Sequence, residues 1–118
     1  MRLRSDIWVA AYLRRCGVEG VSAVLRRRGA AEAGAIFVKV DHLNGSATLY
    51  GPAPQSVAAE APRGVDRTFV RAHGGPSIHP TEAEARLKRE IAFDPDLWIV
   101  EVENGVDGAW LDLAPEPH

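Results

Sequence analysis

The pair Asn44-Gly45 between two apolar runs constrains the fold of this chain more than any other local feature. The flanking segments AIFVKVDHL and SATLYG alternate apolar and polar residues, and an Asn-Gly pair between such segments is typical of a β-hairpin with a type I′ turn. A two-residue loop pairs Val40 with Leu49, which puts both side chains on a buried face and leaves Lys39 on a solvent-facing one. This register predicts that Val40→Asp is strongly destabilising and Lys39→Asp is nearly neutral.

Two segments elsewhere in the chain predict helices. The first covers residues 5–16, with Ser5 as the N-cap. Its apolar stripe is expected to face the core and consists of Ile7, Ala10, Ala11 and Leu13. The second begins at a capping box in which Thr81 is the N-cap and Glu84 reaches back to it. It ends near Phe93, because a proline two residues later disfavours helical backbone at the residue between them.

Four further segments predict strands, at residues 22–28, 67–71, 97–103 and 109–113. The segment 21–28 also fits a helical period, but Gly20 and Gly29 bracket only eight residues and this short length favours a strand. The predicted order is α-β-β-β-β-α-β-β. Short links between strands exclude parallel crossovers, so the sequence predicts an α+β fold: a mostly antiparallel sheet of about five to six strands with two helices on one face.

The length of 118 residues predicts a single domain over residues 1–113 and a frayed tail at 114–118. Two connections, residues 52–66 and 72–80, are long enough to be functional or mobile loops. Only one cysteine is present, Cys16, which excludes an internal disulfide and favours a reducing compartment. No apolar run approaches the length of a membrane span and the N-terminal run is short and ends in two arginines, so we expect a cytoplasmic protein with no membrane partner.

Charge is distributed unevenly along the chain. Residues 1–29 carry seven arginines and two acidic residues, whereas residues 80–118 carry three basic and ten acidic ones. The simplest interpretation is that the two ends of the chain lie side by side, with Arg26 or Arg28 near Glu101 on a neighbouring strand. Strand alternation sends these two arginines to one face and Arg27 to the other. The alternative is a basic binding face, but the isoelectric point of about 6.1 makes nucleic acid an unfavoured partner.

A few residues are candidates for a functional site. His73 and His79 flank a Gly-Gly-Pro loop, and Asp94 and Glu101 could join them in acid–base chemistry. The histidine spacing matches no standard zinc pattern, so we expect no metal and no cofactor. Cys16 is expected to be a small buried residue rather than a nucleophile. Trp8 lies off the apolar stripe of its helix and is a candidate binding residue together with Arg26 and Arg28.

Several phrases of the sequence resemble one protein family. They are RLRSDIWVAAYLRRC, RRGAAEAGAIFVKV, LYGPAP and LKREIAFDPDLWIVEVE, which together span most of residues 2–103. These phrases are similar to the short bacterial proteins grouped as domain of unknown function 1491. The resemblance implies a compact bacterial domain. It implies no activity, cofactor or catalytic residue.

The expected function is a non-enzymatic binding or adaptor domain that recognises an unknown protein partner or a second copy of itself. No motif meets the joint demands of a nucleophile, a base and an oxyanion donor, so we do not favour an enzyme. Two alternatives stay open at this point. One is a small enzyme that uses the loop histidines and acidic residues, and the other is a nucleic-acid accessory protein that uses the N-terminal arginines.

Overall fold

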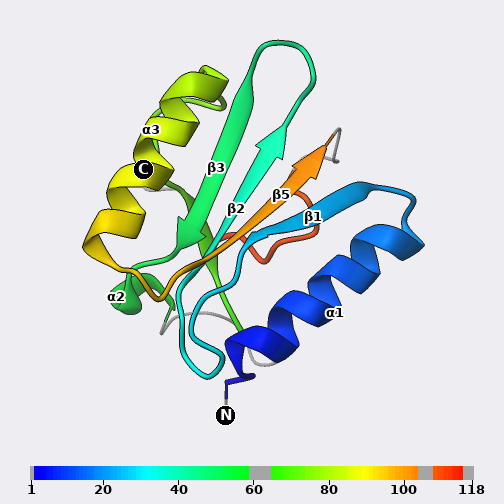
Figure 1. Ribbon diagram of the computed structural model, residues 1–118, viewed down its shortest axis with the longest axis vertical. Helices are drawn as coiled ribbons and strands as arrows, with labels where there is room; N and C mark the ends of the chain where they lie inside the picture. The colour runs from blue at the N-terminus through cyan, green and yellow to red at the C-terminus, as the bar shows by residue number, and fades with distance from the viewer. Residues whose placement is uncertain (1, 59–64, 104–107, 116–118) are drawn as a thin grey trace.

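A five-stranded sheet with the strand order β1-β5-β2-β3-β4 forms the centre of the computed structural model (Figure 1). The structure describes residues 2–58, 65–103 and 108–115. Its strands are β1 (Ser22–Arg27), β2 (Ile36–Asp41), β3 (Ala47–Pro52), β4 (Phe69–Arg71) and β5 (Trp98–Glu103). Its helices are α1 (Ser5–Val18), α2 (Gln55–Ala58) and α3 (Pro80–Phe93). β2 and β5 run parallel and the other neighbouring strands run antiparallel, which confirms a mostly antiparallel α+β fold.

The segment 21–28, whose sequence fits a helical period as well as a strand, contains the strand β1. β1 pairs antiparallel with β5, with Val24 opposite Glu101 and Ala23 opposite Val102. The basic start and the acidic end of the chain are therefore neighbours, as their opposite charges predicted. The pairing contains a bulge between Leu25 and Arg27, where the register shifts.

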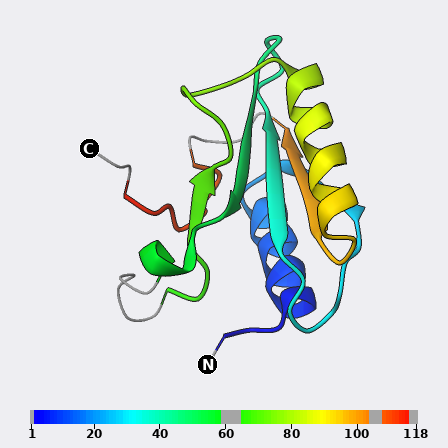
Figure 2. The ribbon, with the colours of Figure 1, turned by 90° about the vertical axis from the view of Figure 1, so that its left-hand side faces the viewer.

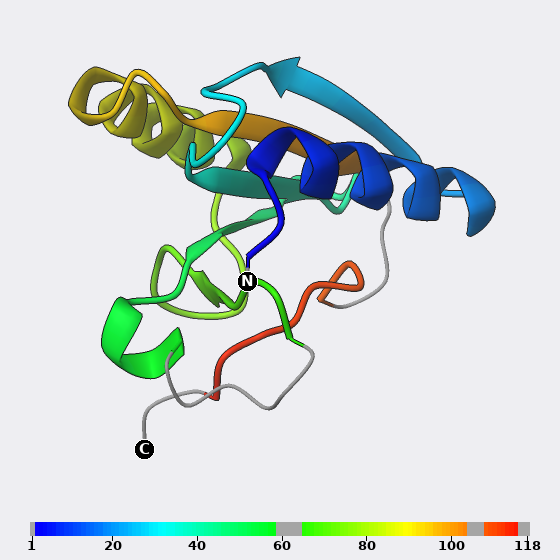
Figure 3. The ribbon, with the colours of Figure 1, turned by 90° about the horizontal axis from the view of Figure 1, so that it is seen from below.

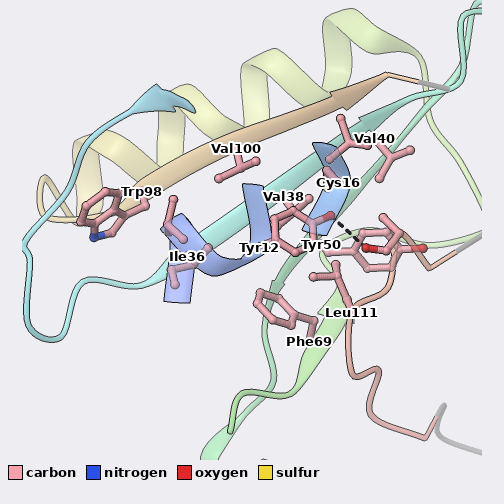
Figure 4. Close-up of a cluster of buried hydrophobic side chains, with 13 residues drawn as sticks. Tyr12, Cys16, Ile36, Val38, Val40, Tyr50, Phe69, Trp98, Val100 and Leu111 are labelled. Carbon is pink, nitrogen blue, oxygen red and sulfur yellow. Dashed lines mark hydrogen bonds between the residues drawn. The ribbon is translucent and has the colours of Figure 1, made fainter. Parts of the chain in front are cut away.

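The two long helices cover opposite faces of the sheet, so the prediction that both lie on one face is wrong (Figure 3). On the α1 side, Tyr12 and Cys16 pack against Val38 and Val100 (Figure 4). On the α3 side, Leu87 belongs to a second cluster, whose sheet residues are Phe37, Leu49 and Ile99. The physical reason lies in β2, where every residue from Ile36 to Val40 is buried. A strand buried on both faces needs a helix on each side.

The hairpin of β2 and β3 exists, but its predicted register is wrong by one residue. Lys39 lies opposite Leu49, and Val40 lies opposite Thr48. The loop has three residues because Leu43 adopts a left-handed backbone with a φ of 58°, and the His42 amide donates to the Ser46 carbonyl. The expected solvent face does not exist either: Lys39 is only 6% exposed.

Helix α1 begins at Ser5, close to the prediction, but it buries a different face from the one expected. Its buried residues are Ser5, Val9, Tyr12 and Cys16. Ser5 is not an N-cap: its hydroxyl donates to the Gly34 carbonyl at 2.6 Å. The predicted stripe of Ile7, Ala10 and Ala11 points to solvent instead, and Leu13 is partly buried.

Helix α3 ends at Phe93 as predicted and buries Ala83 and Leu87. Its predicted N-cap is wrong, because the helix begins at Pro80 and His79 is the capping residue. The Nδ1 atom of His79 accepts from the Thr81 amide at 3.2 Å and bonds the Thr81 hydroxyl at 2.6 Å. The proline at the first helical position fixes the start two residues earlier than the capping box suggested.

The segment 109–113 is not a strand. Ala109 and Trp110 have positive φ angles of 47° and 59°, which an extended strand cannot accommodate. The chain then runs beside β4, where the Phe69 amide donates to Asp112 and the amide of the buried Ala114 donates to Phe69 (Figure 2). The last three residues of the predicted tail lie outside the described residues.

Candidate functional site

A hollow of about 480 Å³ lies beside β4 and the Gly-Gly-Pro loop. Its lining is largely apolar and includes Phe69 and Leu113, while Tyr50, Arg71 and His73 contribute polar groups. This volume falls within the range of small-molecule pockets. The hollow contains one of the four residues predicted for acid–base chemistry, namely His73.

His73 serves as a clamp for the loop. Its Nε2 atom accepts from the Leu49 amide at 3.1 Å, so this nitrogen carries no proton. The other nitrogen, Nδ1, lies 3.0 Å from the Gly74 carbonyl and must donate to it. Both ring nitrogens are thus engaged with the backbone, one with β3 and the other with the next residue of the loop. This arrangement suits a residue that positions a loop, not a general base.

The other three predicted catalytic residues lie elsewhere. His79 caps the start of α3, and Asp94 follows the end of that helix, where its carboxylate accepts from the Asp96 amide at 3.0 Å. A helix of 14 residues separates them by about 20 Å. Glu101 lies on β5 and pairs with Arg26. Among the described residues, no three His, Cys, Asp or Glu side chains are arranged to hold a metal ion.

Cys16 is fully buried in the α1-side cluster, as predicted. Burial raises the pKa of its thiol, although the hydrogen bond with Tyr12 opposes that shift. A thiol that is kept neutral and away from solvent is not an activated nucleophile.

An ion cluster joins β1, β2, β5 and α3. The Arg26 guanidinium lies 2.7 Å from a Glu84 oxygen and 2.9 Å from a Glu101 oxygen. The Lys39 ammonium lies 2.7 Å from the other Glu84 oxygen. The hydrogen bond from Arg26, followed by that from Lys39, lowers the pKa of Glu84 to about 2, although burial opposes the shift. The same carboxylate raises the pKa of Arg26.

The cluster makes stability depend on pH in one direction. The pKa of Glu84 falls from 4.5 to about 2 on folding, so its contribution is complete above pH 4.5 and disappears as the pH falls towards 2. We expect Glu84→Gln to lower the free energy of unfolding at pH 7 by about 1 kcal/mol, because water screens this partly exposed carboxylate. Urea unfolding between pH 7 and pH 2.5 measures the free energy of unfolding of both proteins. The difference in this free energy between wild type and Glu84→Gln should become smaller below pH 4.5. Glu90→Gln, on an exposed part of α3, is the control. A difference that stays constant with pH would contradict the role of the cluster.

Arg27, the last residue of β1, and Arg28, which follows it, do not form a continuous basic face with Arg26. The bulge places Arg27 opposite Ile99, on the α3 side, and its guanidinium donates to the Leu97 carbonyl at 2.9 Å. Arg28 instead stacks over the Trp98 ring at 5.2 Å, and Trp98 belongs to the α1-side cluster. The predicted grouping of Arg26 with Arg28 is therefore wrong, because a bulge shifts the alternation of side chains by one residue. Two of the three arginines are held by protein acceptors and one by an aromatic ring.

Trp8 is half-buried rather than an exposed anchor. Its ring stacks on Tyr12 at 5.0 Å and lies 5.3 Å from Phe69. It packs against the α1-side cluster and helps to join α1 to β4.

Sequence reasoning missed a surface that we call the outer face of α1. It consists of Ile7, Ala10, Ala11, Arg14 and Val18, which recur at helical spacing opposite the buried side of the helix. Ile7 is 49% exposed and Val18 is 79% exposed. The signal was present in the sequence, since most of these residues are apolar. From the sequence, this face was predicted to lie in the core because α1 carries apolar residues on both sides. The side that is actually buried looks less apolar in the sequence, since it contains Ser5 and Tyr12.

Comparison with known proteins identifies the family. A family model described as a protein of unknown function, DUF1491, matches residues 3–111. The chain belongs to the DUF1491 family. No curated protein matches the sequence.

Solved structures of related proteins share the DUF1491 fold. A solution structure of a protein from A. tumefaciens is 40% identical, with a TM-score of 0.79, and the match covers 100% of this chain and 99% of that one. A crystal structure of a DUF1491 family protein from Caulobacter crescentus is 32% identical, with a TM-score of 0.75 and coverage of 98% and 100%. An NMR structure of a DUF1491 family protein from the same organism is also 32% identical, with a TM-score of 0.73 and coverage of 98% and 99%. Within the described part of this chain, no helix is both long and apolar enough to cross a membrane.

Proposed function

We propose that this DUF1491 protein is a non-enzymatic binding domain that recognises a protein surface through the outer face of α1. The observation that carries the proposal is the double-sided character of this helix. One side supplies Val9, Tyr12 and Cys16 to the core, while the opposite side exposes Ile7 and Val18. The helix therefore exposes apolar residues beyond the side that it buries, and apolar residues grouped on an exposed face favour a protein contact.

The candidate catalytic residues lie far apart and each has a structural partner, which supports a binding role over a catalytic one. His73, His79 and Asp94 hold backbone groups in three different places, and Glu101 is engaged by Arg26. The arginines of β1 are similarly engaged within the chain, which weighs against nucleic acid. The single buried thiol is consistent with action in a reducing compartment, and we include the cytoplasm and a single domain over residues 1–113 in the proposal.

The test is a capture experiment with matched variants. Tagged wild-type chain is compared with Ile7→Arg, on the outer face, and with Phe93→Arg, an exposed apolar residue on α3 that lies outside that face. We expect a protein from the native host, including an untagged copy of this chain, to be retained by wild type and Phe93→Arg and lost with Ile7→Arg. Circular dichroism checks that both variants fold. Retention that is equal in all three, or absent from all three, would reject the outer face as a recognition surface.

A further inference from the structure

We infer that the partner recognised by the outer face of α1 is a second copy of this chain, packed with the two α1 helices antiparallel around a two-fold axis near Ala10 and Ala11. The inference rests on the proposed function and names its partner. Figure 1 shows α1 along the outside of the molecule, with the sheet on its other side. A two-fold contact requires a surface that complements itself, and the residues of this face meet that requirement.

The centre of the face is built for close approach. Ala10 and Ala11 are both exposed and lie midway between Ile7 and Arg14. Small side chains at a crossing point allow two helix axes to approach to about 8 Å. Around this centre, the antiparallel arrangement places Ile7 of each copy against Arg14 of the other. The aliphatic stem of Arg14 can then cover Ile7 while its charged head stays near water.

Charge decides the direction of packing. Arg14 is the one charged residue of the face, and in the described part of the chain neither Arg14 nor Arg15 forms an ion pair with a carboxylate. Asp6 flanks the face one turn before Ala10, and its side chain is 31% exposed. It already accepts bonds from Arg4 at 3.2 Å, but a carboxylate has room for further donors.

In the antiparallel arrangement, Asp6 of each copy lies beside Arg14 of the other, so the contact contains two equivalent ion pairs. A parallel arrangement would instead bring the two Arg14 side chains together. It would also place helix ends of the same partial charge side by side, which is repulsive. In the antiparallel arrangement, the two Arg14 positions are about 10 Å apart along the axis, near the distance at which physiological salt screens them. The face is about 20 Å long and 10 Å wide, which is small for a protein interface. We therefore expect a weak dimer.

The test reverses the charge at each end of the proposed ion pair in separate variants and measures their dimerisation alone and mixed. Sedimentation velocity from about 10 μM to about 1 mM spans the dissociation constants of weak contacts. We expect wild type to shift from monomer to dimer over this range. Arg14→Glu alone and Asp6→Arg alone should each raise the dissociation constant at least tenfold, because each puts like charges at both pairs. An equimolar mixture of the two variants restores an attractive pair at both positions, so we expect it to dimerise about as well as wild type. Lys88→Glu, exposed on α3, is the control that leaves the dimer unchanged.

The mixture distinguishes a specific contact from a folding defect, because two misfolded variants would not rescue each other. Wild type that stays monomeric at about 1 mM would overturn the inference, as would a mixture that stays as weakly associated as its components. Binding of monomeric wild type to phosphatidylserine vesicles would assign the face to a membrane and also overturn it. If Ile7→Arg abolishes capture of a different protein while wild type remains monomeric, the self-association fails and the proposed binding function stands.

Discussion

Gly34→Ala should destabilise the protein by about 3 kcal/mol or more, because the new methyl group has no space. A Cβ atom at this position would overlap the Asp96 carbonyl oxygen and lie only 2.9 Å from both the Ala30 carbonyl oxygen and the Trp98 ring. Two of these three neighbours are backbone atoms that are held by other bonds. The Asp96 carbonyl accepts from the Ala30 amide at 2.9 Å, and the Ala30 carbonyl accepts from the Trp98 ring nitrogen at 2.8 Å.

Gly17→Ala provides the matched control for this prediction. Gly17 lies within α1, and a Cβ atom there would meet nothing within 4 Å. Replacing a helical glycine by alanine stabilises a protein by about 0.5–1 kcal/mol, so the two substitutions should have opposite signs. Urea unfolding monitored by tryptophan fluorescence measures both. A loss of less than about 1 kcal/mol for Gly34→Ala would show that the loop from Gly29 to Gly34 can move away from β5.

Features that depend on local chemistry or on overall charge could be predicted from the sequence. The end of α3 follows from the proline after Phe93, and the pairing of β1 with β5 follows from the opposite charges at the two ends of the chain. The family follows from the phrases shared across residues 2–103, and the family match covers residues 3–111.

Features that depend on the choice between two similar faces could not be predicted. Each face of β2 is apolar enough to be buried, so the alternation of residues does not say where the helices lie. The same ambiguity in α1 led to the wrong buried stripe, since Ile7 and Val9 are equally apolar and only packing against the sheet distinguishes them. A bulge or a left-handed residue then shifts a register by one position. Leu43 does so in the hairpin, and the irregularity after Leu25 does so in β1.

The candidate site was harder to predict than the fold for the same reason. His73 and His79 are close in sequence, but one clamps a loop against β3 and the other caps α3. Their separation depends on the path of the chain between β4 and α3, which residue types alone do not specify. Arg26 was predicted to lie near Glu101, and it does, but its second partner Glu84 comes from a helix that was expected elsewhere.

Lys39→Asp should destabilise the protein by about 3–5 kcal/mol, in contrast to the nearly neutral effect that the predicted register implied. Lys39 is 6% exposed, and its ammonium lies 2.7 Å from Glu84 and 3.7 Å from Glu101. The substitution removes one of the two cations of the cluster and adds a third carboxylate, so Arg26 alone would face three negative charges. Buried charges without compensation are among the most destabilising changes known in proteins.

Lys39→Met removes the ammonium group without adding a carboxylate. Comparing it with Lys39→Asp therefore separates the cost of the added negative charge from the cost of losing the positive one. Methionine keeps most of the aliphatic stem in its buried position, and Glu84 keeps its bidentate contact with Arg26 at 2.7 and 2.8 Å. Because Glu84 and Glu101 both keep Arg26 as a partner and Glu84 is partly exposed, Lys39→Met leaves no carboxylate of the cluster without a cation, and we expect it to remain within about 1 kcal/mol of wild type. Val40→Asp, at a position that is 1% exposed, should be as costly as Lys39→Asp. Urea unfolding of the three variants at pH 7 then tests the register directly. If Lys39→Asp is as stable as Lys39→Met, the side chain of residue 39 faces water and the observed pairing of Lys39 with Leu49 beneath α3 is wrong.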